Sequence, residues 1–386
     1  MTVASPPRVL DAAALVTEVV DEVVVRTVRD THVAWLDRVH GLLDRVPGRP
    51  ATVPEAVHRS IASAVYGGLG VGCRTAAAGL GALADHGVGP DLDTPRGRFL
   101  TSAVDGIIGD RLARERPRLA VPLAVRRDGR DVPVEPDALA AAYPAATGRV
   151  AVLLHGLSEN ETAFDRRRAE VGATYADTLA LLGATPVLLR ANTGLAVREN
   201  GVALAALLRD LVEAWPVPVE RLTLVGHSMG GLVIRAACAV AVHDPQPWAG
   251  RVDHVVTLGT PHLGAPLAQG VGRGARVLAR LPETAAFGRV LDQRSNGVLD
   301  LVDGLGDDVP PLPHAHYHLV SATLARSPSH PVSRLLGDLL VRQPSAYGRR
   351  RWSLFPGADE LHLPATGHLD LLNHPAVHRA LHTWLA

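Results

Sequence analysis

Short apolar runs alternate with helical segments from Val150 to the end of the chain, and this rhythm limits the fold more than any other feature. Parallel strands need a long crossover, commonly a helix, so the alternation predicts a parallel sheet covered by helices. The expected strands are residues 150–156, 185–191, 221–227, 253–260 and 317–323, followed by a short final strand at 360–363. The expected helices lie near residues 165–182, 200–214 and 229–243.

The residues before this pattern divide into a helical region and a hairpin. To about residue 115, apolar residues recur at helical spacing, and a third helix is expected from Arg98 to Glu115. Asp128-Gly129 lies within alternating sequence and predicts a type I′ hairpin. We therefore expect a helical region at residues 1–118, accessory or lid-like, and an α/β domain at residues 119–386.

One long segment interrupts the strand rhythm. Residues 262–306 are Gly-rich and irregular, and they follow the strand expected at 253–260. In open α/β sheets, ligands bind beyond the carboxyl ends of the strands, where such an insertion would lie. The sequence therefore predicts a lid or cap at residues 262–306.

Composition excludes several classes of function. The 39 basic and 39 acidic residues balance, which gives no electrostatic reason to expect a nucleic-acid partner. Acidic residues interrupt the apolar N-terminal stretch, unlike a signal peptide, and no uncharged apolar run reaches about 18 residues. We expect a soluble, cytoplasmic protein. Peripheral contact with a lipid surface is the alternative suggested by the small, apolar segment at residues 54–87.

The sequence Gly226-His227-Ser228-Met229-Gly230 fits the pattern G-x-S-x-G. It follows the apolar run Leu222–Val225 and opens a helical segment, which is the strand–turn–helix context that a nucleophile elbow requires. In such an elbow the serine lies at a sharp turn, where neighbouring backbone leaves no room for side chains at the glycines. Ser228 is therefore the expected nucleophile.

A hydrolase of this type also needs two backbone N–H groups that stabilise an oxyanion. One comes from the residue after the nucleophile, here Met229. The other comes from the loop after an earlier strand, and Leu157 is expected there because it follows His155-Gly156.

The general base is expected to be His368. It lies in a loop between the final strand and the last helix, after the nucleophile in chain order, as this fold requires. His374 is the alternative, but Pro375 behind it is typical of a helix N-terminus, which favours a capping role.

The carboxylate that orients the base is expected between the serine and the histidine. Asp338 follows the strand at 317–323 and its connecting loop, and it is the preferred acid. Asp359 is the main rival. Asp370 is too near His368 in sequence, and three further aspartates precede the relevant strand: Asp303, Asp307 and Asp308.

Metal and cofactor chemistry is not expected. His314, His316 and His318 alternate around a strand entry, where three rings on one face are a pattern found in zinc sites. A solvated strand end in a chain with 18 histidines is the favoured interpretation. The sequence contains no H-E-x-x-H, P-loop or dinucleotide-binding motif.

The chain resembles the bacterial esterase and lipase branch of the α/β-hydrolases, near the lipase and GPI-inositol-deacylase-like proteins. The matching segments, in the family's order over residues 150–386, are LLHGL, GHSMGG, TLGTPHLGAP, LLGDLLV and GHLDLL. This resemblance implies an α/β-hydrolase fold, a part in lipid metabolism, and nucleophile, acid and base roles for Ser228, Asp338 and His368. The family's acid loop usually reads Gly-Asp-Gly, whereas Leu339 replaces the second glycine here.

Together these features predict a carboxylic ester hydrolase, an esterase or lipase that acts on a small-molecule or lipid ester through an acyl-enzyme. Two alternatives remain. An acyltransferase would use the same triad and differ only in letting an alcohol outcompete water. A non-catalytic binding protein on a hydrolase shell would be marked by a missing triad member.

Overall fold

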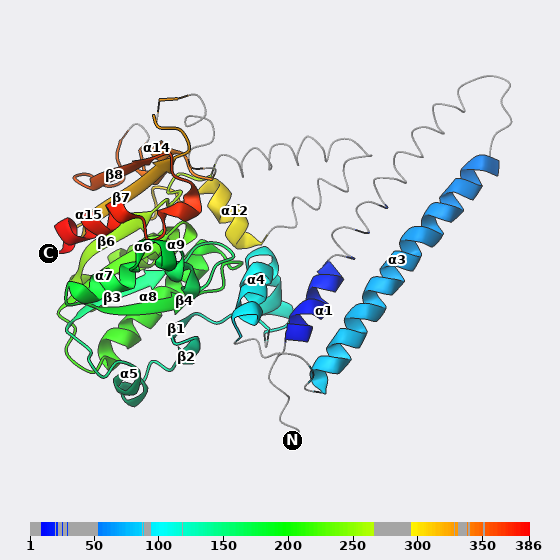
Figure 1. Cartoon of the computed structure of the whole chain (residues 1–386), viewed down its shortest axis with the longest axis horizontal. Coiled ribbons are helices and arrows are strands. Elements are labelled where there is room, and N and C mark those ends of the chain that lie inside the picture. The colour runs from blue at the N-terminus through cyan, green and yellow to red at the C-terminus, as the bar shows by residue number, and fades with distance from the viewer. Residues whose placement is uncertain are drawn as a thin grey trace. The chain divides into compact units, whose positions relative to one another are not determined.

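The computed structural model divides into two compact units (Figure 1). The smaller unit contains Met1–Thr101 and Gly270–Arg294, and the larger contains Ser102–Gln269 and Ser295–Ala386. The residues that the structure describes are 9–19, 21, 25, 29, 53–86, 88, 94–117, 119–265, 295–327, 329–330, 338, 340–349 and 352–386.

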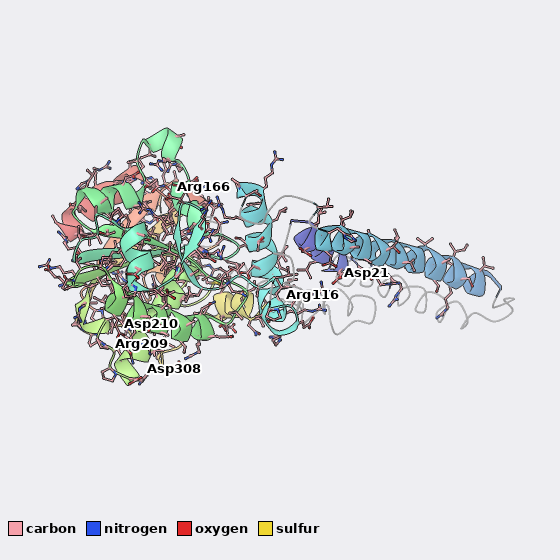
Figure 2. All side chains as sticks on the ribbon, turned by 90° about the horizontal axis from the view of Figure 1, so that it is seen from below. Asp21, Arg116, Arg166, Arg209, Asp210 and Asp308 are labelled. Atoms are coloured by element: carbon pink, nitrogen blue, oxygen red, sulfur yellow. The ribbon has the colours of Figure 1, made fainter. Side chains whose placement is uncertain are left out.

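In the smaller unit, helix α1 (Val9–Val19) packs against the long helix α3 (Val53–Asp85). Just after α1 lies Asp21, which is labelled in Figure 2. Its buried carboxylate pairs with Arg74 of α3 at 3.0 Å. Within the described ranges, no helix combines the length and the apolar character needed to cross a membrane. Helix α4 (Pro95–Glu115) begins in this unit and ends in the larger one. A domain boundary at residue 118 stays a prediction.

The larger unit is built on an eight-stranded sheet in the order β2-β1-β4-β3-β5-β6-β7-β8. The strands are β1 (Ala124–Arg127), β2 (Arg130–Val132), β3 (Arg149–Leu154), β4 (Thr185–Arg190), β5 (Arg221–His227), β6 (Val252–Leu258), β7 (His316–Thr323) and β8 (Asp359–Pro364). β4, β3 and β5–β8 are parallel, while β1 pairs antiparallel with both β2 and β4. This mostly parallel sheet confirms the predicted α/β-hydrolase architecture.

The hairpin has the turn that its sequence predicts. Asp128 and Gly129 both have positive φ, at 50° and 77°. Two consecutive residues with positive φ define the type I′ turn, whose twist matches that of the flanking strands.

Helices cover both faces of the sheet. Successive side chains of β3 point to opposite faces, so this strand contributes to two cores. Val150, Val152 and Leu154 join one core with α8 (Val197–Ala214) and α9 (Met229–His243). Ala151 and Leu153 join the other core, with α7 (Tyr175–Leu181) and α15 (Pro375–Leu385). Each buried leucine or valine contributes about 1.5–3 kcal/mol to stability. The remaining helical elements are α5 (Pro136–Ala142), η2 (Glu161–Asp165), α6 (Arg168–Val171), η3 (Ala249–Arg251), α12 (Asn296–Asp303), α14 (Gln343–Ala346) and η4 (His368–Leu371).

The single helix expected near residues 165–182 is wrong in detail, because the segment is divided into η2, α6 and α7. Gly172 ends α6 with a left-handed φ of 86°. Thr174 then starts α7 with a capping box, in which its side chain and that of Asp177 bind each other's backbone N–H groups.

The lid predicted at residues 262–306 is described only at its two ends. Its return segment contains α12, which is capped by the Ser295 side chain. Residues 266–294 lie outside the described residues, so the lid stays a prediction.

Both cysteines, Cys73 and Cys238, are free thiols.

Candidate active site

Ser228 occupies the sharp turn between β5 and α9. Its φ of 52° and ψ of −121° belong to a strained conformation that non-glycine residues rarely adopt. The turn is held by a hydrogen bond of 2.8 Å from the Ser228 N–H to the carbonyl of Leu258, the last residue of β6. Ser228 is also the N-cap residue of α9, whose free N–H groups favour negative charge.

Glycine is required around this serine by the close approach of backbone. A Cβ at Gly226 would lie 2.5 Å from the nitrogen of Gly231, and one at Gly230 would lie 2.5 Å from the carbonyl oxygen of His155. Neither neighbour can move away, because both are backbone atoms. The two fixed glycines of the sequence pattern therefore have the steric role that was predicted for them.

The structure brings Asp338 and His368 together. Nδ1 of His368 lies 2.8 Å from Oδ2 of Asp338, and the His368 N–H donates to the Asp338 carbonyl at 3.0 Å. The other oxygen of Asp338 accepts hydrogen bonds from the N–H groups of Leu340 and Val341 at 3.0 and 2.8 Å. Both side chains are buried. The carboxylate therefore requires a proton on Nδ1 of His368 and leaves Nε2 to act as an acceptor.

The ring of His368 lies where β6 ends beside Ser228. Gly259, with a positive φ of 60°, follows Leu258, and a Cβ there would lie 3.0 Å from Cε1 of His368. Nε2 of His368 is buried and has no hydrogen-bond partner within the described part of the chain, so Ser228 is not bonded to it here. Catalytic hydrogen bonds are often long in free enzymes and tighten when substrate binds.

The two rival residues have other roles in the structure. His374 is the N-cap of α15, where its Nδ1 accepts from the N–H of Ala376 at 3.1 Å, as Pro375 suggested. Asp359 begins β8 and pairs with Nδ1 of His318 at 2.9 Å, and His318 stacks on Trp384.

The segment after β3, Gly156–Asn160, is called the oxyanion loop here. The N–H groups of Leu157 and Met229 donate no hydrogen bond to any other described residue, as oxyanion donors require before substrate binds. Ser158 has a positive φ of 58°, and its N–H donates to Thr193 at 3.1 Å. A Cβ at Gly156 would lie 2.9 Å from that of Ser228, so this glycine lets the loop approach the nucleophile.

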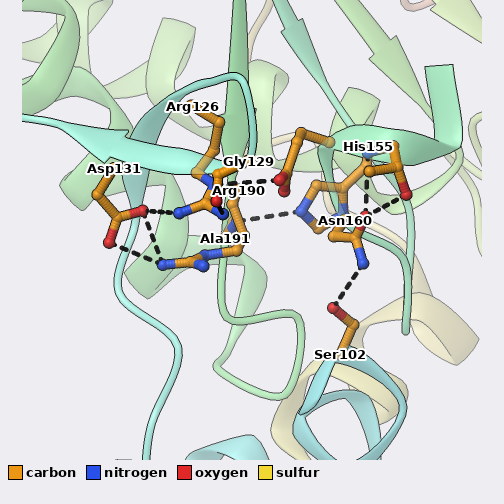
Figure 3. Close-up of polar contacts among 10 residues, drawn as sticks. Ser102, Arg126, Gly129, Asp131, His155, Asn160, Arg190 and Ala191 are labelled. Carbon is orange, nitrogen blue, oxygen red and sulfur yellow. Dashed lines mark hydrogen bonds and ion pairs between the residues drawn. The ribbon is translucent and has the colours of Figure 1, made fainter. Parts of the chain in front are cut away.

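A buried polar network supports the oxyanion loop (Figure 3). Nε2 of His155 accepts from the N–H of Ala191 at 3.1 Å, so its Nδ1 carries the proton and donates to the Gly156 carbonyl at 2.9 Å. The amide of Asn160 donates to Ser102 of α4 at 3.2 Å. Further along, Arg126 of β1 bonds Glu161 at 3.1 Å and also pairs with Asp131, which in turn holds Arg190. The loop is therefore fixed from both the sheet and α4.

Two residues near the site that the sequence analysis did not assign are Glu159 and His227. Oε2 of Glu159 accepts from the N–H of Gly156 and contacts Nδ1 of His227, both at 2.8 Å. Burial raises the pKa of Glu159, but the charge and hydrogen bond of His227 outweigh burial and lower that pKa to about 2. Burial likewise lowers the pKa of His227, and the Glu159 carboxylate more than reverses this. A sequence signal was present, since His227 directly precedes Ser228 and Glu159 follows Leu157 by two residues, but only the fold pairs them.

The three histidines considered as zinc ligands are divided among different contacts. Nε2 of His314 lies 3.0 Å from the carbonyl of Ala249, while Nε2 of His318 faces Nδ1 of His254 at 3.0 Å. Across the described ranges, no cluster of three histidine, cysteine or acidic side chains is arranged to hold a metal ion.

One family model matches the sequence. Residues 194–281 match the model described as the PGAP1-like alpha/beta domain, and this range includes β5, Ser228 and α9. The match confirms the predicted resemblance over the segment that carries the elbow. No curated protein matches the sequence.

Among solved structures, the mature form of a lipase from Bacillus licheniformis is 21% identical and has a TM-score of 0.44, with 62% of this chain and 92% of that one covered. A carboxylesterase from Bacillus subtilis is 16% identical, with coverages of 63% and 84% and a TM-score of 0.37. A thioesterase of the prodiginine pathway in Streptomyces coelicolor is 18% identical, with coverages of 63% and 86% and a TM-score of 0.36.

Proposed function

We propose that this chain is a serine hydrolase that cleaves carboxylic esters through an acyl-enzyme. The observation that carries the proposal is the Asp338–His368 pair, whose free Nε2 belongs to a ring packed at the end of β6, beside the strained elbow of Ser228. The orientation of Nε2 as an acceptor is what a general base needs. The family match over the elbow agrees with this chemistry.

In the proposed reaction, Nε2 of His368 takes the hydroxyl proton as Oγ of Ser228 attacks the ester carbonyl carbon. The N–H groups of Leu157 and Met229 stabilise the oxyanion, and each such donor contributes on the order of a hundredfold or more in rate. The intermediate collapses to the acyl-enzyme, and His368 gives its proton to the departing alcohol. Water then attacks the acyl group by the same route and releases the acid.

The residues beside the acid and the base present apolar surface, which suits an apolar acyl or alkyl group. Leu340 and Leu369, which lie in the loops of the acid and the base, are exposed at 46% and 40%. We propose that the substrate is a small-molecule or lipid ester, and we keep peripheral contact with a lipid surface as an alternative. We also keep as proposals the lid at residues 262–306 and an accessory role for residues 1–118.

A fluorophosphonate probe tests the assignment of the nucleophile directly. The wild-type chain is expected to be labelled, Ser228→Ala is expected to lose labelling, and Ser327→Ala in an exposed loop is expected to keep it. A folded wild-type chain that is not labelled would overturn the proposal. Ester turnover with and without an added acceptor alcohol then separates hydrolysis from acyl transfer, and a series of acyl lengths defines the pocket.

A further inference from the structure

The pair formed by Glu159 and His227 connects three segments of the site. Glu159 belongs to the oxyanion loop, and His227 is the residue immediately before the nucleophile. Nε2 of His227 lies 3.4 Å from the backbone carbonyl of His368, and the two imidazole rings are 5.0 Å apart. The pair therefore touches the oxyanion loop, the elbow and the loop of the general base.

The geometry assigns a charge to His227. Its Nδ1 faces the carboxylate of Glu159, and its Nε2 faces the carbonyl of His368. Both of these partners only accept hydrogen bonds. A neutral imidazole has one N–H and would direct a lone pair at one of the two acceptors, whereas the imidazolium donates to both.

The other groups near His227 agree with a cation at this position. The carboxylates that act on it are Glu159 and, from the acid loop, Asp338. His155 also interacts with Glu159, but burial lowers the pKa of His155, so it adds no competing charge. His227 is itself 1% exposed, so water does not screen its interaction with Glu159.

We propose that Glu159 and His227 form a buried ion pair whose cation holds the carbonyl of His368, and that both are positioning residues for the reaction. The carboxylate fixes the Gly156 N–H and the imidazolium at one oxygen, which sets the oxyanion loop against the elbow. The imidazolium then fixes the loop that presents the general base. This inference rests on the proposed function, because the segments it aligns are those of the proposed triad.

The charge has a consequence that a purely structural contact does not have. When His227 loses its proton, one of its two donated hydrogen bonds is lost, and Nε2 repels the carbonyl of His368 instead of holding it. The pKa of His227 is raised, so this loss occurs as the pH rises above the ordinary range of histidine. We therefore expect kcat/KM to fall on the alkaline side with the titration of His227.

The variant Glu159→Gln tests this expectation because glutamine keeps the shape and one acceptor oxygen but removes the charge. We expect kcat/KM to fall by on the order of tenfold to a hundredfold near neutral pH, since a misplacement of about 1 Å costs up to a hundredfold. The alkaline limb of the pH profile is expected to move to lower pH. Glu213→Gln, near the end of α8, is the matched control and is expected to change neither.

The nitrogen-15 resonances of the His227 imidazole provide a second readout that needs no catalysis. In the wild-type chain near neutral pH, both ring nitrogens are expected to be protonated, and in Glu159→Gln only one. A neutral His227 in the wild type, or a Glu159→Gln profile lowered equally at every pH, would overturn the inference. If Ser228 is not labelled but His227 is doubly protonated, the proposed function fails while the ion pair stands.

Discussion

Among single residues, the pairing of Asp338 with His368 decides how the proposed base is oriented. Asparagine at this position would keep the size of the side chain but present either a neutral acceptor or an N–H to Nδ1 of His368. Without the carboxylate, the imidazole is no longer held in the tautomer that accepts at Nε2, and its positive charge is not stabilised. We expect Asp338→Asn to lower kcat by about 10³–10⁴-fold.

The rival acid supplies the control for this prediction. Asp359→Asn removes the carboxylate that pairs with Nδ1 of His318, whose other contacts are His254 and Trp384 rather than the proposed triad. Its kcat for an ester substrate is expected to stay within a few-fold of wild type. A loss of activity in Asp359→Asn with Asp338→Asn unaffected would reverse the assignment of the acid.

The sequence was enough to nominate Ser228, Asp338 and His368 as candidates but not to connect them, and it did not assign Glu159 or His227. Ser228 could be predicted because its motif is local, with strand, turn and helix adjacent along the chain. Asp338 and His368 required the chain order of a family, since 30 residues separate them. Glu159 and His227 are 68 residues apart, and their pairing depends on how β3 and β5 are aligned in the sheet.

At the scale of elements, strands were easier to predict than helices. The β3, β4, β5, β6 and β7 strands begin within one residue of the expected positions, because buried parallel strands are uniformly apolar and end at polar turns. The region from η2 to α7 was predicted as one helix near residues 165–182, between two expected strands. Gly172 and the capping box of Thr174 divide this region into separate helices. Such local signals end a helix only where the fold requires the chain to turn.

The contact between α8 and α9 offers a test of packing between elements. Gly201 of α8 faces α9, where an added Cβ would overlap the Cβ of Ala236 and lie 2.9 Å from its carbonyl carbon. The backbone of α9 cannot yield without displacing Ser228 at its start. Gly201→Ala is expected to lower the free energy of unfolding by about 1–3 kcal/mol, as overpacking does. It should also reduce fluorophosphonate labelling.

Gly250→Ala is the matched control in the same unit, because a Cβ at Gly250 meets no atom within 4 Å. In urea unfolding, this substitution is expected to leave the free energy of unfolding unchanged or to raise it by up to about 1 kcal/mol. If both substitutions have the same effect, close packing of α8 on α9 is not the reason for glycine at position 201.

At the scale of the whole larger unit, the segment of α4 from Ser102 onward contributes a buried carboxyl group to the site region. Asp105 accepts a hydrogen bond from the N–H of Thr193 at 2.9 Å, while its Oδ1 has no partner within the described residues. Burial raises its pKa to about 8, against the lowering effect of its backbone hydrogen bonds. We therefore expect Asp105 to carry a proton in the folded protein at neutral pH.

This proton links the stability of the unit to pH. Between about pH 4 and pH 8 the unfolded chain ionises Asp105 and the folded chain does not, so folding takes up a proton and the free energy of unfolding falls as pH rises. The loss is at most about 1.4 kcal/mol for each pH unit, and it ends above the folded pKa.

The asparagine of the variant Asp105→Asn has no proton to take up, so this variant should gain stability over the wild type steadily between about pH 5 and pH 8. Urea unfolding at about pH 5 and at about pH 8 measures this difference in stability. The control is Asp110→Asn, which loses an ion pair to Arg114 on the same helix. A gain for Asp105→Asn that is the same at both pH values would mean that Asp105 is ionised in the folded protein, and α4 would then place a charge rather than a neutral acid beside the oxyanion loop.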